Sequence, residues 1–179
     1  MSDEPSVDLG AFDPRNANGL IAVALPDQLM AAEFLMAVRR IASQNRLQLR
    51  DAVLVVKNAD EQVVVQETID PQPARSALSG ALWAGLLGLL VGGPIGWAVG
   101  LGVGAGVGVG VAKVVDLGIP DEWVKWFRSA VQPGTAAVIV LVEDLEVAAF
   151  RAEVDRFPGA EILHTTLRAG ALDELTRTD

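Results

Sequence analysis

Three acidic pairs and one histidine are the side chains of this sequence best suited to acid–base or metal chemistry. Each pair stands at a predicted turn or helix start, where carboxylates cap helices and solvate turns. The pairs are Asp60–Glu61, Asp121–Glu122 and Glu143–Asp144. His164 lies in a predicted strand, and the chain has no Cys and no second His. We therefore expect no catalytic residue and no metal site.

The glycine-rich stretch suggests a nucleotide-binding loop, but its spacing argues against one. A dinucleotide loop needs glycines at offsets of two and then three. From Gly100 to Gly110 every glycine occupies an even position, so an offset of three never occurs there. Lys113 is followed by Val114 rather than by Ser or Thr, so the Walker pattern is absent too. We expect no cofactor.

The composition is that of an acidic chain with one unusual segment. The 179 residues carry 14 Lys and Arg against 23 Asp and Glu, a formal net charge of -9. This balance argues against nucleic acid as a partner, because nucleic-acid binding relies on Lys and Arg to neutralise phosphates. Residues 76–112 carry no charge and hold 12 of the 18 glycines. The N-terminus lacks the basic and apolar regions of a signal peptide.

Similar strand–helix–strand patterns flank this charge-free segment. The first half has a strand, an amphipathic helix and two more strands, predicted over Leu20–Leu25, Met30–Ile41, Ala52–Lys57 and Val63–Thr68. The second half has a helix starting at Pro120 and then a strand, a helix and a strand, predicted over Ala137–Val142, Val147–Phe157 and Ala160–Leu167. Asp27 is the predicted cap of the first long helix, Glu143–Asp144 cap the later one, and Pro158–Gly159 end it.

These elements predict a ferredoxin-like α+β sandwich, with one sheet and helices packed on one face. The chain then divides into four parts. They are an N-terminal arm (1–18), the first half of the α+β domain (19–75), the charge-free segment (76–112), and the second half with a C-terminal tail (113–179).

Small residues recur at every fourth position through the charge-free segment. They are Gly80, Ala84, Gly88, Gly92, Gly96, Gly100, Gly104, Gly108 and Ala112. On a helix this period makes a stripe along which two backbones approach closely. Glycine costs a helix about 1 kcal/mol relative to alanine, and Gly100–Gly110 alone is also compatible with a flat strand or a flexible linker. The period and the length without charge favour helices that pack on lipid or on each other.

Gly93–Pro94, near the middle of the segment, predicts a turn. It leaves stretches of 16 and 18 residues. As helices these would be about 24 and 27 Å long, slightly short of a hydrocarbon core of about 30 Å. If the two flanking halves share one sheet, both ends of the segment must emerge on the same side. We therefore predict a helical hairpin rather than a single span.

Charged and aromatic residues near the hairpin predict its orientation. Arg75 and Lys113 flank it and its tip has no charge, so the positive-inside rule places both termini in the cytoplasm. Trp97 near the tip, and Trp123 and Trp126 after the exit, resemble interfacial anchors. The last two can equally form the apolar face of the helix that follows the segment.

Several motifs follow one another in the second half of the chain. The first is a Gly/Ala zipper that runs into the sequence VDLGIPD at 115–121. The others are Lys125, the stretch Gln132–Ala137 and the strand ending Leu141–Asp144. With these motifs, the chain resembles the bacterial predicted-membrane family called domain of unknown function 1269. The resemblance extends from about residue 19 to residue 167. Pro120 replaces a second acidic residue typical of that family, and Trp123 is bulkier than usual. The resemblance implies an α+β domain interrupted by a glycine-zipper hairpin, a link to stress responses and no catalytic residues.

These features predict a non-enzymatic protein of the cytoplasmic membrane. Its hairpins would pack together into a homo-oligomer, with the acidic α+β domain as a cytoplasmic platform. An alternative is a soluble ring, tube or shell in which the hairpins bury one another without lipid. A pore is a weaker alternative, because the hairpin offers no charged side chain to line it. A small-molecule sensor would rest on fold analogy alone.

Overall fold

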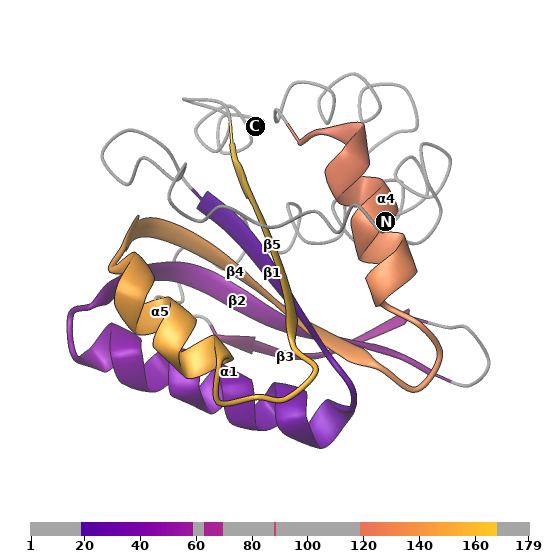
Figure 1. Ribbon diagram of the computed structural model, residues 1–179, viewed down its shortest axis with the longest axis horizontal. Coiled ribbons are helices and arrows are strands. Elements are labelled where there is room, and N and C mark those ends of the chain that lie inside the picture. The colour runs from indigo at the N-terminus through magenta and orange to yellow at the C-terminus, as the bar shows by residue number, and fades with distance from the viewer. Residues whose placement is uncertain (1–18, 59–62, 70–87, 89–118, 168–179) are drawn as a thin grey trace, which may run out of the picture.

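The computed structural model of the chain describes residues 19–58, 63–69, 88 and 119–167. The described residues form five strands and three helices (Figure 1). In chain order these are β1 (Gly19–Leu25), α1 (Gln28–Ser43), β2 (Leu47–Lys57), β3 (Val63–Ile69), α4 (Asp121–Ala130), β4 (Ala136–Leu145), α5 (Val147–Val154) and β5 (Glu161–Thr166).

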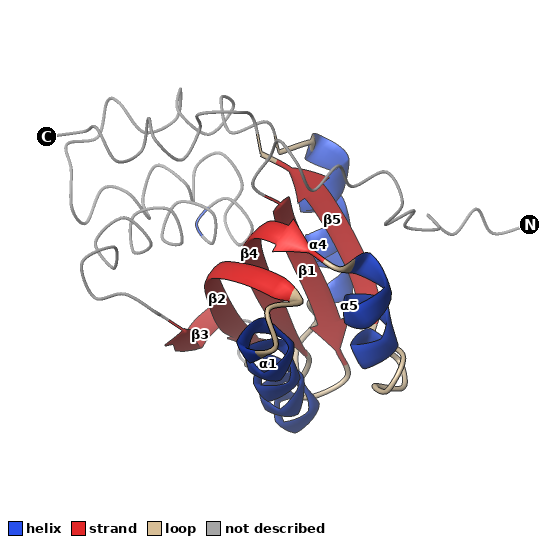
Figure 2. Cartoon of the chain, turned by 90° about the vertical axis from the view of Figure 1, so that its left-hand side faces the viewer, coloured by secondary structure: helices blue, strands red, loops and turns tan. Residues whose placement is uncertain are grey.

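All the described strands lie in one antiparallel sheet. Their order is β3-β2-β4-β1-β5, and Figure 2 shows them side by side in that order. β4 comes from the second half of the chain, yet it pairs with both β1 and β2 from the first half. The two halves therefore share one sheet, and the predicted α+β class is confirmed.

Helices cover both faces of the sheet. α1 and α5 pack on one face, whereas α4 packs on the other, behind β1 and β5 in Figure 2. The prediction that the helices share one face is correct for α1 and α5 and wrong for α4. The physical reason lies in the strands, because β1 and the first seven residues of β4 are apolar and buried at every position. Strands of this kind require cover on both sides.

Local sequence fixes both ends of α1. Asp27 is the N-cap, as predicted, and its side chain accepts a hydrogen bond from the Met30 amide at 2.8 Å. Phe34 and Val38 lie on the face of the helix that is buried against the sheet. After Ser43 the chain turns through Asn45, whose φ of 58° is left-handed, a conformation that Asn tolerates better than most residues. The turn leads directly into β2.

Three phenylalanine rings fill the core under α1 and α5. The Phe34 ring meets Phe150 and Phe157 edge-on, with centroids 5.9 and 5.3 Å away. The later helix is shorter than predicted, since α5 ends at Val154. Phe157 lies in the turn that follows, where its amide donates to the Val154 carbonyl at 2.9 Å. This turn keeps the ring in the core without a further helical residue.

The acidic pair Glu143–Asp144 lies inside β4, so its predicted capping role is wrong. Both side chains are exposed, and the N-cap of α5 is Glu146, which makes no side-chain capping bond. Glu143 forms an ion pair with Arg50 of β2 at 2.6 Å. This cross-strand pair favours continuation of the ladder past the apolar run.

Candidate functional site

The helix α4 presents two aromatic rings to the sheet. Pro120 is its N-cap, and Asp121 and Glu122 lie in its first turn, where the helix dipole favours negative charge. The predicted position of this acidic pair at a helix start is confirmed, but neither residue is the N-cap and the helix has no side-chain capping bond. Trp123 and Phe127, one turn apart, stack with centroids 5.7 Å apart and an interplanar angle of 12°. Both side chains are buried, so α4 is fixed against the sheet by its apolar face.

These two rings belong to a second hydrophobic core on the α4 face. Its buried members are Leu20, Ala22, Val53, Val55, Trp123, Phe127, Val131, Ala137, Ile139, Leu141 and Leu167. Trp126 and Ile119 are half-buried at its margin. The predicted apolar helical face is confirmed. Since the core encloses the Trp123 side chain, of the two tryptophans of α4 only Trp126 keeps the predicted interfacial role.

Two buried polar side chains lie in one row across this face. Asp51 of β2 is buried, and its Oδ1 accepts a hydrogen bond from the Ala52 amide at 2.8 Å. In the strand register Asp51 pairs with Leu141, Leu141 with Leu20, and Leu20 with Thr165, which is also buried. Asp51 and Thr165 therefore mark the two ends of a row whose middle is apolar.

Asp51 is a buried carboxylate that the sequence reasoning missed. A charged residue just before an apolar run looks like the boundary of a strand, and the strand was predicted to start at Ala52. The usable signal was the period of two in Asp51, Val53 and Val55, which places all three on one face. β2 instead begins at Leu47.

The indole of Trp123 adds a third polar group to this core. Within the described residues its buried Nε1–H has no hydrogen-bond acceptor. A buried donor without a partner costs about 1–3 kcal/mol. The packing of the ring therefore has to outweigh this cost.

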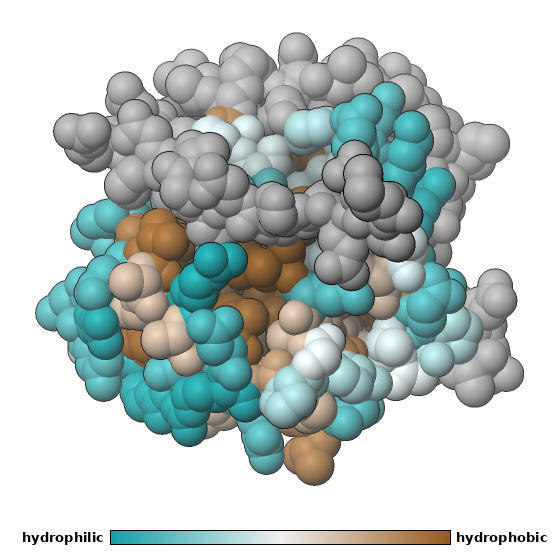
Figure 3. Space-filling view, in the orientation of Figure 1, coloured by the Kyte–Doolittle hydropathy of each residue, from teal (hydrophilic) through white to brown (hydrophobic). Residues whose placement is uncertain are grey.

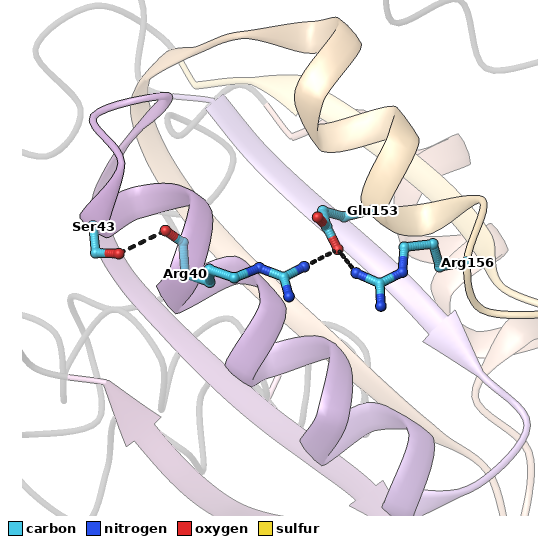
Figure 4. Close-up of polar contacts among 4 residues, drawn as sticks. All are labelled: Arg40, Ser43, Glu153 and Arg156. Atoms are coloured by element: carbon cyan, nitrogen blue, oxygen red, sulfur yellow. Dashed lines mark hydrogen bonds and ion pairs between the residues drawn. The ribbon is translucent and has the colours of Figure 1, made fainter.

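Ion pairs join the elements on the solvent side of the other face. Glu153 of α5 accepts hydrogen bonds from Arg40 of α1 at 2.6 Å and from Arg156 at 2.9 Å, while Ser43 donates to the Arg40 carbonyl (Figure 4). Figure 3 shows mainly hydrophilic residues at the lower left of the view and hydrophobic ones toward its middle, with one hydrophobic residue projecting at the bottom. Exposed pairs of this kind contribute little each; here they connect α1 to α5.

Arg46, in the turn before β2, and Glu146, the N-cap of α5, form a bidentate ion pair. Arg46 Nε lies 2.8 Å from Glu146 Oε2, and Nη2 lies 2.8 Å from Oε1. These hydrogen bonds lower the pKa of Glu146 and raise the pKa of Arg46. The Glu146 amide also donates to the Arg46 carbonyl at 2.9 Å, so backbone and side chains fix the same junction.

The remaining chemically capable side chains do not converge. His164 is half-buried in β5 opposite Ile21 of β1, while Asp121 begins α4 and Glu143 lies in β4. In the part of the chain that the structure describes, no group of three or more His, Asp or Glu side chains could hold a metal ion. That this protein is not an enzyme stays a prediction.

Most of the residues predicted to form the hairpin lie outside the described residues. Gly88 is described, and it has helical conformation and is half-buried. The hairpin residues outside the described part are Arg75, Gly80, Ala84, Gly92, Gly93, Pro94, Gly96, Trp97, Gly100, Gly104, Gly108, Ala112 and Lys113. The acidic pair Asp60–Glu61, predicted to lie in a turn, is also outside the described residues. No helix among the described residues is both long enough and apolar enough to span a membrane.

The fold described above defines a small α+β protein with helices on both faces of one sheet. The family described as "Protein of unknown function (DUF1269)" matches residues 77–178, more than half of the chain. The chain belongs to this family, as the four-residue period of Gly and Ala and the motifs after it predicted. No curated protein and no solved structure matches the chain.

Proposed function

We propose that this chain is a non-enzymatic protein that associates with itself at the cytoplasmic membrane. The charge-free segments of neighbouring copies pack together, and the α+β domain serves as a platform on the cytoplasmic side. The observation that carries the proposal is the four-residue period of small side chains from Gly80 to Ala112, in a stretch without charge. Helices with such a stripe gain van der Waals contact from close backbone approach.

A hairpin, rather than a single crossing, is favoured by the elements on either side of the segment. β3 pairs with β2, and α4 packs on the same sheet. A segment that crossed a membrane once would pull β3 and α4 to opposite sides. Gly93–Pro94 is the proposed turn, and Arg75 and Lys113 favour a cytoplasmic position for both ends.

The platform is, in our proposal, a ferredoxin-like domain. Its support is the order β2-β4-β1-β5 within the sheet, with α1 following β1 and α5 following β4. Two interleaved strand–helix–strand units on one face are the mark of that fold. β3 is then an added edge strand and α4 an added helix on the opposite face.

A soluble assembly is the second candidate, and the length of the hairpin favours it. Its two arms of 16 and 18 residues are somewhat short for a bilayer core, which takes a helix of about 20 residues. In such an assembly the hairpins of several copies would bury one another inside a ring, tube or shell. The stripe of small residues would make the same contacts in both cases.

The helix contact is tested by adding bulk to the stripe. Gly96→Leu and Gly100→Leu should each reduce the mass of the particle in detergent, because a leucine keeps the backbones apart. Ala98→Leu is the matched control, since residue 98 lies on the opposite side of a helix from 96 and 100. An unchanged mass for both glycine variants would count against contact through the stripe.

Membrane attachment is tested separately by fractionating cells that express the intact chain. The membrane proposal expects the protein in the membrane fraction and its release by detergent but not by high salt. Protein that remains in the soluble fraction as a large particle would favour the soluble assembly. Protein that is soluble and monomeric would overturn both.

A further inference from the structure

Two exposed apolar side chains lie on one side of α1. Leu29 is 71% exposed and Met36 is 59% exposed, and Val64 of β3, at 37%, is the next most exposed large apolar side chain among the described residues. Residues seven apart on a helix point in nearly the same direction and lie about 10 Å apart along its axis. The pair forms a narrow apolar stripe on the side of α1 that faces away from the sheet. One hydrophobic residue projects at the bottom of Figure 3, on the side where Figure 1 shows α1.

The charged groups beside this stripe are unevenly paired. Glu153 of α5 accepts hydrogen bonds from both Arg40 and Arg156, as Figure 4 shows, so these three side chains together carry one positive charge. Glu33 is exposed and forms no ion pair within the described residues. It precedes Arg40 by seven residues, so the two lie on the same flank of the stripe. That flank is therefore acidic in the first half of α1 and basic in the second.

This charge pattern is complementary to itself. A two-fold axis perpendicular to α1 makes two copies of the helix antiparallel and brings the same flank of each together. Glu33 then lies opposite Arg40 of the second copy when the axis passes midway between them, beside Met36. A parallel pair of helices, or an anionic lipid surface, would instead leave Glu33 facing negative charge.

The same register accommodates both apolar side chains of the stripe. Met36 lies at the axis and meets Met36 of the second copy. Leu29 comes seven residues before Met36, so it lies opposite Ser43, which comes seven residues after it. Ser43 is small and exposed, which leaves room for the leucine. Antiparallel packing also places the positive end of each helix dipole beside the negative end of the other.

We propose that α1 of one chain packs antiparallel on α1 of a second chain, with Met36 at the two-fold axis and Glu33 paired with Arg40 across the contact. The inference rests on the proposed self-association, because we expect one helix pair to bury less than the about 1,200 Å² at which stable interfaces begin. Copies held together by their charge-free segments have a high effective concentration for this second contact. A two-fold contact is closed, so it joins the domains of the particle in pairs.

Single cysteine substitutions test this contact in the intact chain, which has no Cys of its own. Met36→Cys should give a disulfide-linked dimer on mild oxidation, because a disulfide forms only where the two Cα atoms come within about 7 Å. Leu29→Cys is the matched control. Residue 29 is the more exposed position, yet its two copies lie about 21 Å apart along the helix axis in this register. When Leu29→Cys is co-expressed with Ser43→Cys, a disulfide should join the two variants.

Particle mass in detergent, measured on the same samples, separates this inference from the proposed self-association. Intact particles without a Met36→Cys dimer would overturn the α1 contact and leave self-association standing. Monomeric chains without a disulfide would overturn both. Equal disulfide yields for Leu29→Cys and Met36→Cys would mean random collision between exposed thiols, and they would also overturn the α1 contact.

A charge reversal in the Met36→Cys background tests the pairing on the flank. Glu33→Arg places two arginines opposite each other, so disulfide formation should slow at least about tenfold at low ionic strength. Ala152→Arg, an exposed change on α5, is the control and should leave the rate nearly unchanged. Equal slowing by both variants, or slowing by neither, would overturn the antiparallel register.

Discussion

At the scale of single residues, Trp123 and Trp126 share one helix but have different surroundings. Trp123 is 2% exposed and stacks on Phe127, whereas Trp126 is half-buried at the margin. Trp123→Ala should lower the free energy of unfolding by about 3–5 kcal/mol, and Trp126→Ala should lower it less. Trp123→Phe should cost less than Trp123→Ala, because it keeps a ring and removes the unpartnered N–H. Urea unfolding followed by circular dichroism measures all three, and equal losses for the two alanine variants would contradict the assigned burial.

Glu146 should make stability depend on pH. Its pKa is lower in the folded protein than in the unfolded chain, because Arg46 donates hydrogen bonds to the carboxylate. The stabilisation is therefore present above the ordinary Glu pKa of about 4.3 and is lost as the pH falls through the lowered folded value. Glu146→Gln should be less stable than the wild type at neutral pH, and the gap should close in acid. Urea unfolding between neutral and acidic pH measures the gap; a gap that is independent of pH would argue against the ion pair.

Gly159 and Gly134 provide a matched pair of left-handed positions. Their φ angles are 77° and 89°, but a Cβ on Gly159 would lie 3.1 Å from Pro26 Cγ, whereas one on Gly134 would meet nothing within 4 Å. Gly134→Ala should cost about 1–2 kcal/mol from backbone strain alone. Gly159→Ala should cost more, since Pro26 must also shift. Thermal unfolding of both variants compares them, and the reverse ranking would contradict this packing.

At the scale of elements, the start of α1 depends on one side chain. Asp27→Ala should lower the free energy of unfolding by about 1 kcal/mol, because the Met30 amide loses its acceptor. Glu33→Ala, an exposed change inside the same helix, is the control and should have a much smaller effect. Chemical unfolding of the two variants tests this, and an Asp27→Ala variant as stable as the wild type would exclude a capping role.

Continuous apolar runs made the positions of the strands predictable, but the ends of strands that contain polar residues were not. β1 and the middle of β4 are apolar at every position and were located to within a few residues. β2 starts five residues before its predicted start, in a stretch where Gln48, Arg50 and Asp51 interrupt the apolar pattern. β4 continues through Glu143–Asp144, where Glu143 forms an ion pair with Arg50 and Asp144 pairs with Gln48 of β2. Pairing between distant strands determines such ends, and no local pattern reports it.

The α4 face was the least predictable part of the candidate site. The helix itself follows from Pro120, Asp121 and the spacing of Trp123 and Phe127. The side of the sheet on which it packs depends on which faces of β1 and β4 the other helices leave uncovered. Strands that are apolar at every position do not indicate which face a given helix covers. The buried Asp51 was missed for a related reason, since its burial comes from its neighbours rather than from its own chemistry.

At the scale of the whole molecule, the sheet depends on both halves of the chain. β4 lies between β1 and β2, so residues 19–75 alone have no partner for β1 and retain only the β2–β3 hairpin, which is marginal in isolation. We expect that fragment to be unfolded by circular dichroism under conditions in which the intact chain is folded. A cooperative thermal transition of the fragment would contradict the central role of β4.

The place where residues 76–112 join the domain has a consequence for how related sequences can diverge. β3 is held by β2, and α4 is held by β1 and β5, so neither depends on the length of the chain between them. Insertions or deletions in that interval leave every strand register unchanged. We therefore expect the register of the described strands to tolerate insertions or deletions of whole four-residue steps within residues 76–112.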